Sequence, residues 1–311
     1  MIGIKNIGVY IPEERISNID KPQHAAVTTE FLTDKVGINK VSRKGKEEKT
    51  SDLCVAAVKN LMKREPSLDL KTIDFICVCT QNGDYSLPQT SAIVHEKLEM
   101  SDACASFDIS LGCSGYVYSI LVAKSFMEAN GLKKGLVITA DPYSEIVDPN
   151  DKNTDLIFGD GAAATLMTDD PVYSIGKGAF YTDGTNHTKL IRYPEKALYM
   201  SGRSVFNFAI RNVPNNIRQS LANNETEISD VDLFILHQGS KFIVDNLVER
   251  MELDPEKVPF AMQEHGNTVS SSIPIILCDH MDNPNNKKIL ISGFGVGLSI
   301  ASTVLKKIID N

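Results

Sequence analysis

The chain contains no tryptophan and only six cysteines among its 311 residues. It has no run of about 18 apolar residues, which excludes a membrane-spanning helix of ordinary length. Residues 1–17 lack a basic start followed by an apolar helix, so we expect no secretory signal peptide and a cytoplasmic location. The formal net charge of −8 argues against nucleic acid as the main partner.

The cysteines lie mostly within apolar runs, as expected for free thiols rather than for a disulfide framework. Cys77 and Cys79 point to the same face of a predicted strand, but no second cluster of ligands accompanies them. We therefore predict no metal site. With 42% hydrophobic and 23% charged residues, the chain has the composition of a globular protein with an ample core.

The stretch Ser106–Ala129 carries the first candidate catalytic residue. Residues 107–111 indicate a short buried strand, and from Cys113 onward apolar residues recur at helical spacing. Cys113 therefore lies at or next to a helix N-terminus, where the dipole and unpaired N–H groups favour an anion. We expect its thiolate to form more easily than at the free pKa of about 8.5. The alternative is a small buried residue that only fills the interior.

Buried strands alternate with helices along the chain, which predicts an α/β fold. Segment 72–83 matches segment 230–240: each has an acidic residue, an apolar run and a polar turn before a helix. Segment 135–144 matches 288–297 at a similar offset of about 155 residues, so we expect a duplicated α/β unit. Segment 156–168 indicates a strand pair or a bulged strand.

Two further polar residues stand beside glycines at the ends of predicted elements. His237 ends the apolar run LFIL, and Asn267 lies in HGNTVSSS. A histidine in such a place is often a hydrogen-bonded interior residue, and an asparagine after glycine often only forms a turn. Their joint appearance with Cys113 and with the turn GFGVG near the C-terminus is more specific than any one of them.

The motifs LGCSGYVYS, FGDGAAA, MSGRSVFNFA, LHQGS, EHGNTVSSSIP and GFGVG follow one another along the chain. This ordered set resembles that of the β-ketoacyl-[acyl carrier protein] synthase III family, and the similarity runs nearly end to end. The resemblance implies a thiolase-like fold whose two pseudo-repeated halves, 1–170 and 171–311, form a layered αβαβα sandwich. It also implies a homodimer without a cofactor or metal, acting on acyl-CoA and acyl carrier protein.

The family's reaction is a decarboxylative Claisen condensation of an acyl-CoA primer with malonyl-acyl carrier protein. The resemblance implies that Cys113 attacks the acyl-CoA thioester and becomes acylated. His237 and Asn267 would donate hydrogen bonds to the malonyl thioester oxygen as negative charge collects there. Backbone N–H groups of Cys113 and Val296 would form the oxyanion hole of the acyl-transfer steps.

The sequence departs from the family pattern around its expected binding residues. Val296 replaces the middle glycine of a Gly-Gly-Gly turn, although valine resists a positive φ and adds bulk. Phe242 stands where the family has an arginine for the carrier protein. The resemblance assigns CoA and carrier-protein binding to Phe31, Lys35, Lys152 and Lys241. Phe31 stands where the family commonly has a tryptophan, and Lys35 and Lys152 stand at positions that are often arginine.

The resemblance places Phe158 in the acyl pocket and has Leu87 reach across the dimer into it, although Phe158 fits a core role equally well.

Three other functions remain open from the sequence. The first is transfer of an acyl group from CoA or carrier protein to an alcohol or amine, with His237 deprotonating the acceptor. The second is a papain-like hydrolase, which shares the order Cys, His, Asn but not its local motif. The third is a catalytically inactive binding module.

Overall fold

The protein, described here over residues 1–308 by a computed structural model, is built on one ten-stranded mixed sheet. Its strands are β1 (Gly3–Tyr10), β4 (Phe75–Cys79), β5 (Ala105–Ile109), β6 (Lys134–Ala140), β7 (Ala162–Thr168), β8 (Tyr173–Ile175), β9 (Ala179–Thr182), β12 (Leu233–Leu236), β13 (Lys288–Gly295) and β14 (Ser299–Lys307). The order is β12-β13-β14-β8-β1-β7-β6-β4-β5, and β9 pairs with β14. Small separate sheets pair β2 (Glu14–Ser17) with β3 (Lys40–Arg43) and β10 (Leu190–Ile191) with β11 (Tyr199–Met200).

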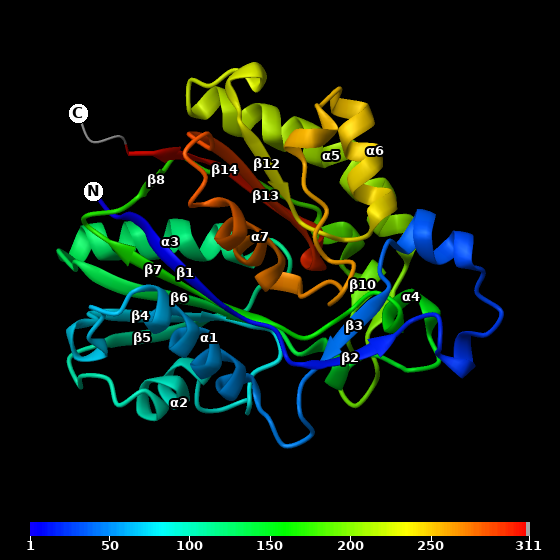
Figure 1. Cartoon of the computed structure of the whole chain (residues 1–311), viewed down its shortest axis with the longest axis horizontal. Coiled ribbons are helices and arrows are strands. Elements are labelled where there is room, and N and C mark those ends of the chain that lie inside the picture. Colours follow the sequence, from blue (N-terminus) through cyan, green and yellow to red (C-terminus); the bar gives the residue numbers. More distant parts are fainter. Residues whose placement is uncertain (309–311) are drawn as a thin grey trace.

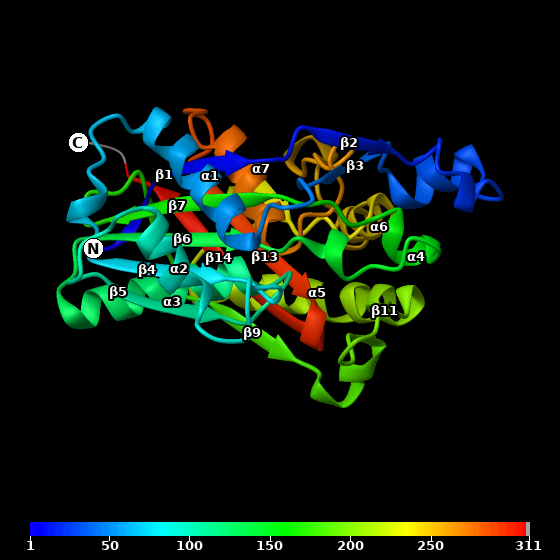
Figure 2. The same cartoon turned by 90° about the horizontal axis from the view of Figure 1, so that it is seen from below.

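The α-helices form a central layer between the two halves of the sheet and an outer layer on each half. They are α1 (Thr50–Arg64), α2 (Thr90–Lys97), α3 (Gly115–Asn130), α4 (Lys152–Asp155), α5 (Gly202–Asn223), α6 (Lys241–Met251) and α7 (Ser272–His280). Helices α3 and α7 contact strands of both halves and form the central layer. Helices α1 and α2 cover the outer face of one half, and α5 and α6 cover the other (Figures 1 and 2). The predicted αβαβα sandwich is confirmed.

Strand β4 shows how the sequence produces these layers. Phe75 and Cys77 face the core beneath α3, whereas Ile76 and Val78 face the core beneath α1. Because both faces are covered, the strand is a continuous apolar run rather than an alternating one. Burial raises the pKa of the Cys77 thiol, which behaves as a packing residue.

The strand pairings repeat between the two ends of the sheet. Strand β4 is parallel to β6, which is antiparallel to β7, and β12 is parallel to β13, which is antiparallel to β14. Strand β8 joins the two sets because it pairs with both β1 and β14. A division into 1–170 and 171–311 places its boundary just before β8, and that boundary stays a prediction.

The expected strand pair over 156–168 is wrong in its first part, since only Ala162–Thr168 is a strand. The preceding residues pair with the loop that carries Asn267 instead of with their own continuation. The N–H of Asn267 donates to Ile157 O at 2.8 Å, and the N–H of Gly159 donates to Asn267 O at 3.1 Å. A Cβ at Gly159 would lie 1.8 Å from the carbonyl oxygen of His265, so this close approach requires glycine.

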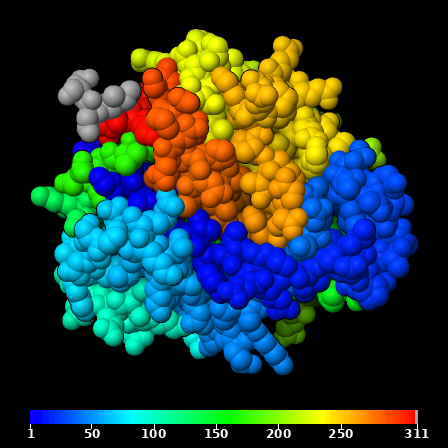
Figure 3. Space-filling model, viewed as in Figure 1, coloured from blue at the N-terminus to red at the C-terminus, as the bar shows by residue number. Residues whose placement is uncertain are grey.

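The N-terminal segment supports the same loop from the outside. The N–H of Asn39 donates to Gln263 O at 2.7 Å, and that of Ser42 donates to His265 O at 2.9 Å. Figure 3 shows the blue N-terminal surface beside the gold and orange surface of the later residues. None of the helices within residues 1–308 combines the length and the apolar character that crossing a bilayer requires.

Candidate active site

A cavity of about 470 Å³ contains all three predicted catalytic side chains. Cys113 lies two residues before α3, His237 directly after β12, and Asn267 in the loop before α7. The nucleophile thus comes from the N-terminal part of the chain and the two other groups from the C-terminal part. His237 and Asn267 follow Cys113 by 124 and 154 positions in the sequence, and the fold brings all three to the same cavity.

Cys113 is only 4% exposed, and the end of β13 packs directly against it. A Cβ added at Gly295 would lie 2.6 Å from the Cys113 sulfur, and one at Gly293 would lie 2.6 Å from its carbonyl oxygen. The next backbone N–H along the chain, that of Val296, donates a hydrogen bond to the sulfur. The glycines therefore allow the backbone to approach the nucleophile.

The backbone of this turn does not require a positive φ at Val296, the position where valine replaces a glycine of the family. Positive φ values occur at Gly295 (155°), Gly297 (80°) and Leu298 (45°), but not at Val296. Valine therefore occupies a position that does not demand the left-handed region, and its N–H still faces Cys113.

Burial raises the pKa of the Cys113 thiol to about 12, and the nearby carboxylate of Asp141 acts in the same direction. The N–H groups of Val296 and of Cys113 itself lower this pKa only in part. The expectation of an easily formed thiolate is therefore wrong, because desolvation outweighs the helix N-terminus.

This raised pKa gives a testable pH dependence. The rate of Cys113 alkylation by iodoacetamide should rise about tenfold per pH unit beyond pH 9, because the thiolate fraction keeps growing up to the pKa of the group. Peptide mass spectrometry would follow Cys113 separately from the other cysteines. A rate that levels off at or below pH 8 would contradict the burial argument.

His237 is 2% exposed and is held through both ring nitrogens. Its Nδ1 lies 2.8 Å from Ser272 Oγ, and its Nε2 lies 3.5 Å from Asn267 Nδ2. The edge-on ring of Phe294, 5.5 Å away between centroids, packs against the imidazole. Burial lowers the pKa of His237 to about 3, so the ring is neutral at pH 7 and has one N–H to donate.

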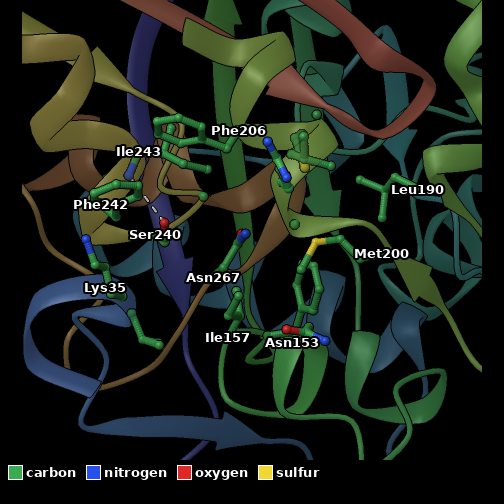
Figure 4. A pocket seen from close by; sticks show the side chains of 18 of the residues that line it. Lys35, Asn153, Ile157, Leu190, Met200, Phe206, Ser240, Phe242, Ile243 and Asn267 are labelled. Atoms are coloured by element: carbon green, nitrogen blue, oxygen red, sulfur yellow. Dashed lines mark hydrogen bonds between the residues drawn. The ribbon is translucent and has the colours of Figure 1, made fainter. Parts of the chain in front are cut away.

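Asn267 is oriented by its own loop. Its Oδ1 accepts the N–H of Val269 at 2.8 Å, which leaves the Nδ2 amide group on the side of His237 and the cavity. Val269 adopts a φ of 54°, a left-handed conformation that is strained for a β-branched residue. Figure 4 shows Asn267 between the Phe242 side and the Met200 side of the cavity.

Helix α4 places two cavity residues, Lys152 and Asn153, and is anchored by a buried ion-pair network. The Asp155 carboxylate lies 2.8 Å from Lys21 Nζ, 3.0 Å from His24 Nε2 and 3.1 Å from an Arg43 nitrogen. Removing one partner of a buried pair leaves an uncompensated charge, which typically costs about 3–5 kcal/mol. The network therefore fixes this wall of the cavity to the N-terminal segment.

Three of the four residues predicted to bind CoA or carrier protein line the cavity, and their binding roles stay predictions. Phe31, Lys35 and Lys152 line the cavity, and the Lys152 ammonium lies 5.4 Å from the Phe31 ring centroid. Lys241 does not line it, because this residue begins α6 and its ammonium pairs with Asp245. Phe158 lines the cavity and packs on Tyr143 at 4.9 Å between centroids.

Leu87 lies outside the cavity of its own chain and is 85% exposed. The predicted role of Leu87, which is to reach across a dimer into the acyl pocket of a second copy, stays a prediction. Leu87 lies in the loop that precedes α2, at the far side of the sheet from α5 and α6.

An aromatic pair that sequence reasoning did not recognise forms another wall. Phe206 stacks on Phe242 at 5.0 Å between centroids and 21° between planes, and Lys35 Nζ lies 3.6 Å above the Phe242 ring. Figure 4 shows these side chains together. Arg203 also lines the cavity, and the motif MSGRSVFNFA, which contains both Arg203 and Phe206, was the available signal.

The close packing of β13 on Cys113 gives a second prediction. Gly295→Ala should slow acylation of Cys113 at least about tenfold, since the new methyl group would overlap the sulfur and the φ of 155° disfavours a side chain. Gly297→Ala is the matched control, because it adds strain at a φ of 80° but meets nothing within 4 Å. Equal acylation rates in the two variants, measured by intact-protein mass spectrometry, would contradict the steric argument.

The layered fold, with a cysteine, a histidine and an asparagine meeting in one cavity, defines a condensing enzyme of the thiolase type. The family model described as 3-Oxoacyl-[acyl-carrier-protein (ACP)] synthase III matches residues 107–184, and the model of its C terminal matches residues 221–307. The chain belongs to the 3-oxoacyl-[acyl-carrier-protein] synthase III family. This membership replaces the papain-like interpretation.

Curated relatives match over nearly the full length. Beta-ketoacyl-[acyl-carrier-protein] synthase III of Streptococcus mutans serotype c is 33% identical over 97% of this chain and 98% of its own. The protein of the same name from Lactococcus lactis subsp. lactis is 32% identical with the same coverage. The solved structure of 3-oxoacyl-[acyl-carrier-protein] synthase III from Aquifex aeolicus VF5 has a TM-score of 0.91 and 30% identity, covering 98% of this chain and 100% of that one.

Within residues 1–308, no group of three or more histidine, cysteine or acidic side chains could hold a metal ion.

Proposed function

We propose that the protein condenses an acyl-CoA primer with malonyl-acyl carrier protein, releasing CO2 and forming a 3-oxoacyl-acyl carrier protein. The observation that carries this proposal is the meeting of Cys113, His237 and Asn267 in one buried cavity. It is supported by the full-length similarity to proteins named for this synthase. No metal or redox cofactor takes part in the proposed steps.

The first step is acylation of Cys113. The sulfur attacks the thioester carbonyl, a new sulfur–acyl bond forms, and the bond to the CoA sulfur breaks. The thiol proton leaves with the CoA thiolate, so no net proton is released. The backbone N–H groups of Cys113 and Val296 stabilise the oxyanion, and one such donor contributes about 2.7–4 kcal/mol in enzymes where it was removed.

The second step generates the carbon nucleophile. The malonyl thioester oxygen accepts hydrogen bonds from His237 and Asn267, and the bond to the carboxylate carbon breaks so that its electron pair forms an enolate. The enolate carbon attacks the acyl group on Cys113 and expels the sulfur, which takes one proton from solvent. A neutral His237, with its pKa near 3, suits a hydrogen-bond donor rather than a cation here.

Binding of the two thioesters is assigned to the cavity wall and its surroundings. Phe31 offers a flat ring for the CoA base, and Lys35 and Lys152 offer point charges to phosphates without the bidentate geometry of arginine. Lys241, on the half-buried start of α6, would meet the carrier protein. Phe158 bounds the acyl group.

We also propose a homodimer formed along the edge strand β5. All five residues of β5 are half-buried, although the strand ends the sheet and leaves one edge unpaired. Exposed apolar side chains lie on the neighbouring segments: Tyr85, Leu87, Val122 and Phe180. Pairing with a second copy would cover this edge and would let Leu87 approach the other copy's acyl site.

One observation favours an alternative acceptor. Phe242, stacked on Phe206 beneath Lys35, gives the cavity an aromatic wall where the family has an arginine for the carrier protein. Such a wall suits transfer of the acyl group to an apolar alcohol or amine, with the lone pair of His237 accepting the acceptor's proton.

Product analysis distinguishes the two reactions. The protein is supplied with acetyl-CoA or butyryl-CoA and with malonyl-acyl carrier protein, and CO2 and the 3-oxoacyl product are measured. Condensation predicts both products in equal amounts. Acyl turnover onto an added amine or alcohol, without CO2, would establish the alternative.

A further inference from the structure

Ser272 is a buried residue, 4% exposed, at the start of α7. Its Oγ lies 2.8 Å from His237 Nδ1 and 3.1 Å from the carbonyl oxygen of Val269. A serine hydroxyl has one proton, so it can donate to only one of these two acceptors at a time. That choice determines which ring nitrogen of the neutral histidine carries hydrogen.

Two arrangements of these hydrogens are possible. When Ser272 donates to Val269, it accepts the Nδ1–H of His237, and the Nε2 lone pair faces the amide nitrogen of Asn267, 3.5 Å away. When Ser272 donates to Nδ1 instead, Nε2 carries the hydrogen. His237 and Asn267 then present two donors, which cannot pair with each other but can share one acceptor.

We propose that Ser272 is a positioning residue that holds His237 in the Nε2–H form when a thioester oxygen lies between His237 and Asn267. Without a thioester oxygen between them, Asn267 would donate to Nε2 and His237 would carry its hydrogen on Nδ1. This inference rests on the proposed function, because the substrate oxygen is the acceptor that both donors share. The exchange releases one proton from Nδ1 to water and takes one from water at Nε2, so the charge of the site is unchanged.

The two half-reactions should respond differently to Ser272→Ala. CO2 release from malonyl-acyl carrier protein should fall about 10- to 100-fold, somewhat less than for outright loss of one oxyanion donor. Acylation of Cys113 by acetyl-CoA should change less than about twofold, because it does not use the Nε2 hydrogen. Ser272→Thr keeps the hydroxyl and should restore most of the CO2 release.

Ser271→Ala is the matched control on the same helix end. Its hydroxyl is also buried, but it bonds to Thr139 rather than to His237. This variant should lower stability without changing the ratio of the two half-reaction rates.

Nitrogen-15 NMR of the full-length protein reports the tautomer directly. We expect hydrogen on Nδ1 of His237 in the free protein and on Nε2 after addition of a malonyl-CoA analogue in which an amide replaces the thioester. Hydrogen on the same nitrogen in both states would overturn the proposal, and this test needs no variant to fold. Equal loss of both half-reactions in Ser272→Ala without rescue by threonine, or no loss at all, would overturn it too. Wild-type protein that releases no CO2 would overturn the proposed function and this role together.

Discussion

Cys113→Ser should leave the protein without an acyl adduct after incubation with acetyl-CoA and should lower turnover by about 10³-fold or more. The serine hydroxyl is a weak nucleophile unless a general base activates it. His237 is hydrogen-bonded to Ser272 and Asn267 rather than to residue 113, so it would not activate a serine hydroxyl there. Intact-protein mass spectrometry measures the adduct.

Cys104→Ser is the matched control for this experiment. Cys104 is partly exposed, lies before β5 and does not line the cavity. Its replacement should leave one acyl group per chain. An adduct that persists in Cys113→Ser and disappears in Cys104→Ser would place the nucleophile elsewhere and remove the basis of the proposed mechanism.

Asn267→Ala should slow the release of CO2 far more than it slows the acylation of Cys113. Cys113 should still be acylated at nearly the normal rate, whereas CO2 release should fall about 10²- to 10³-fold because one of two donors to the thioester oxygen is lost. Rapid-mixing measurement of adduct formation, alongside CO2 release from malonyl-acyl carrier protein, gives both rates.

The variant also leaves the N–H of Val269 without its partner, which typically costs about 1–3 kcal/mol of stability for a buried group. The thermal unfolding of the variant should therefore be measured together with its kinetics. Asn267→Asp keeps the acceptor for Val269 but removes the amide donor, and it should show the same kinetic separation. Equal losses in acylation and in CO2 release would mean that Asn267 only supports the loop.

The layered fold could be predicted because its signals are local. Strands such as β4 are buried on both faces and appear as unbroken apolar runs, and the paired patterns at 72–83 and 230–240 correspond to β4 and β12. Cys113, His237 and Asn267 could be selected because each ends or precedes such an element beside glycine. Their meeting in one cavity depends on how the two halves pack, which the resemblance supplied.

The errors concern properties that depend on distant parts of the chain. The pKa of Cys113 is raised because β13 and the surrounding side chains exclude water, which a helix N-terminus in the sequence does not reveal. Lys241 has an acidic partner one turn further along α6. The segment before Ala162 pairs with the Asn267 loop, more than 100 positions away, instead of forming its own hairpin.

A single-turnover experiment tests the central claim most directly. Protein carrying one acetyl group on Cys113, freed of excess acetyl-CoA, is mixed with malonyl-acyl carrier protein. The account predicts that the adduct disappears at the same rate as CO2 and 3-oxobutanoyl-acyl carrier protein appear, one of each per cysteine. An acetyl group that stays on Cys113 while CO2 is released, or that leaves without any CO2, would contradict the shared use of this cavity by Cys113, His237 and Asn267.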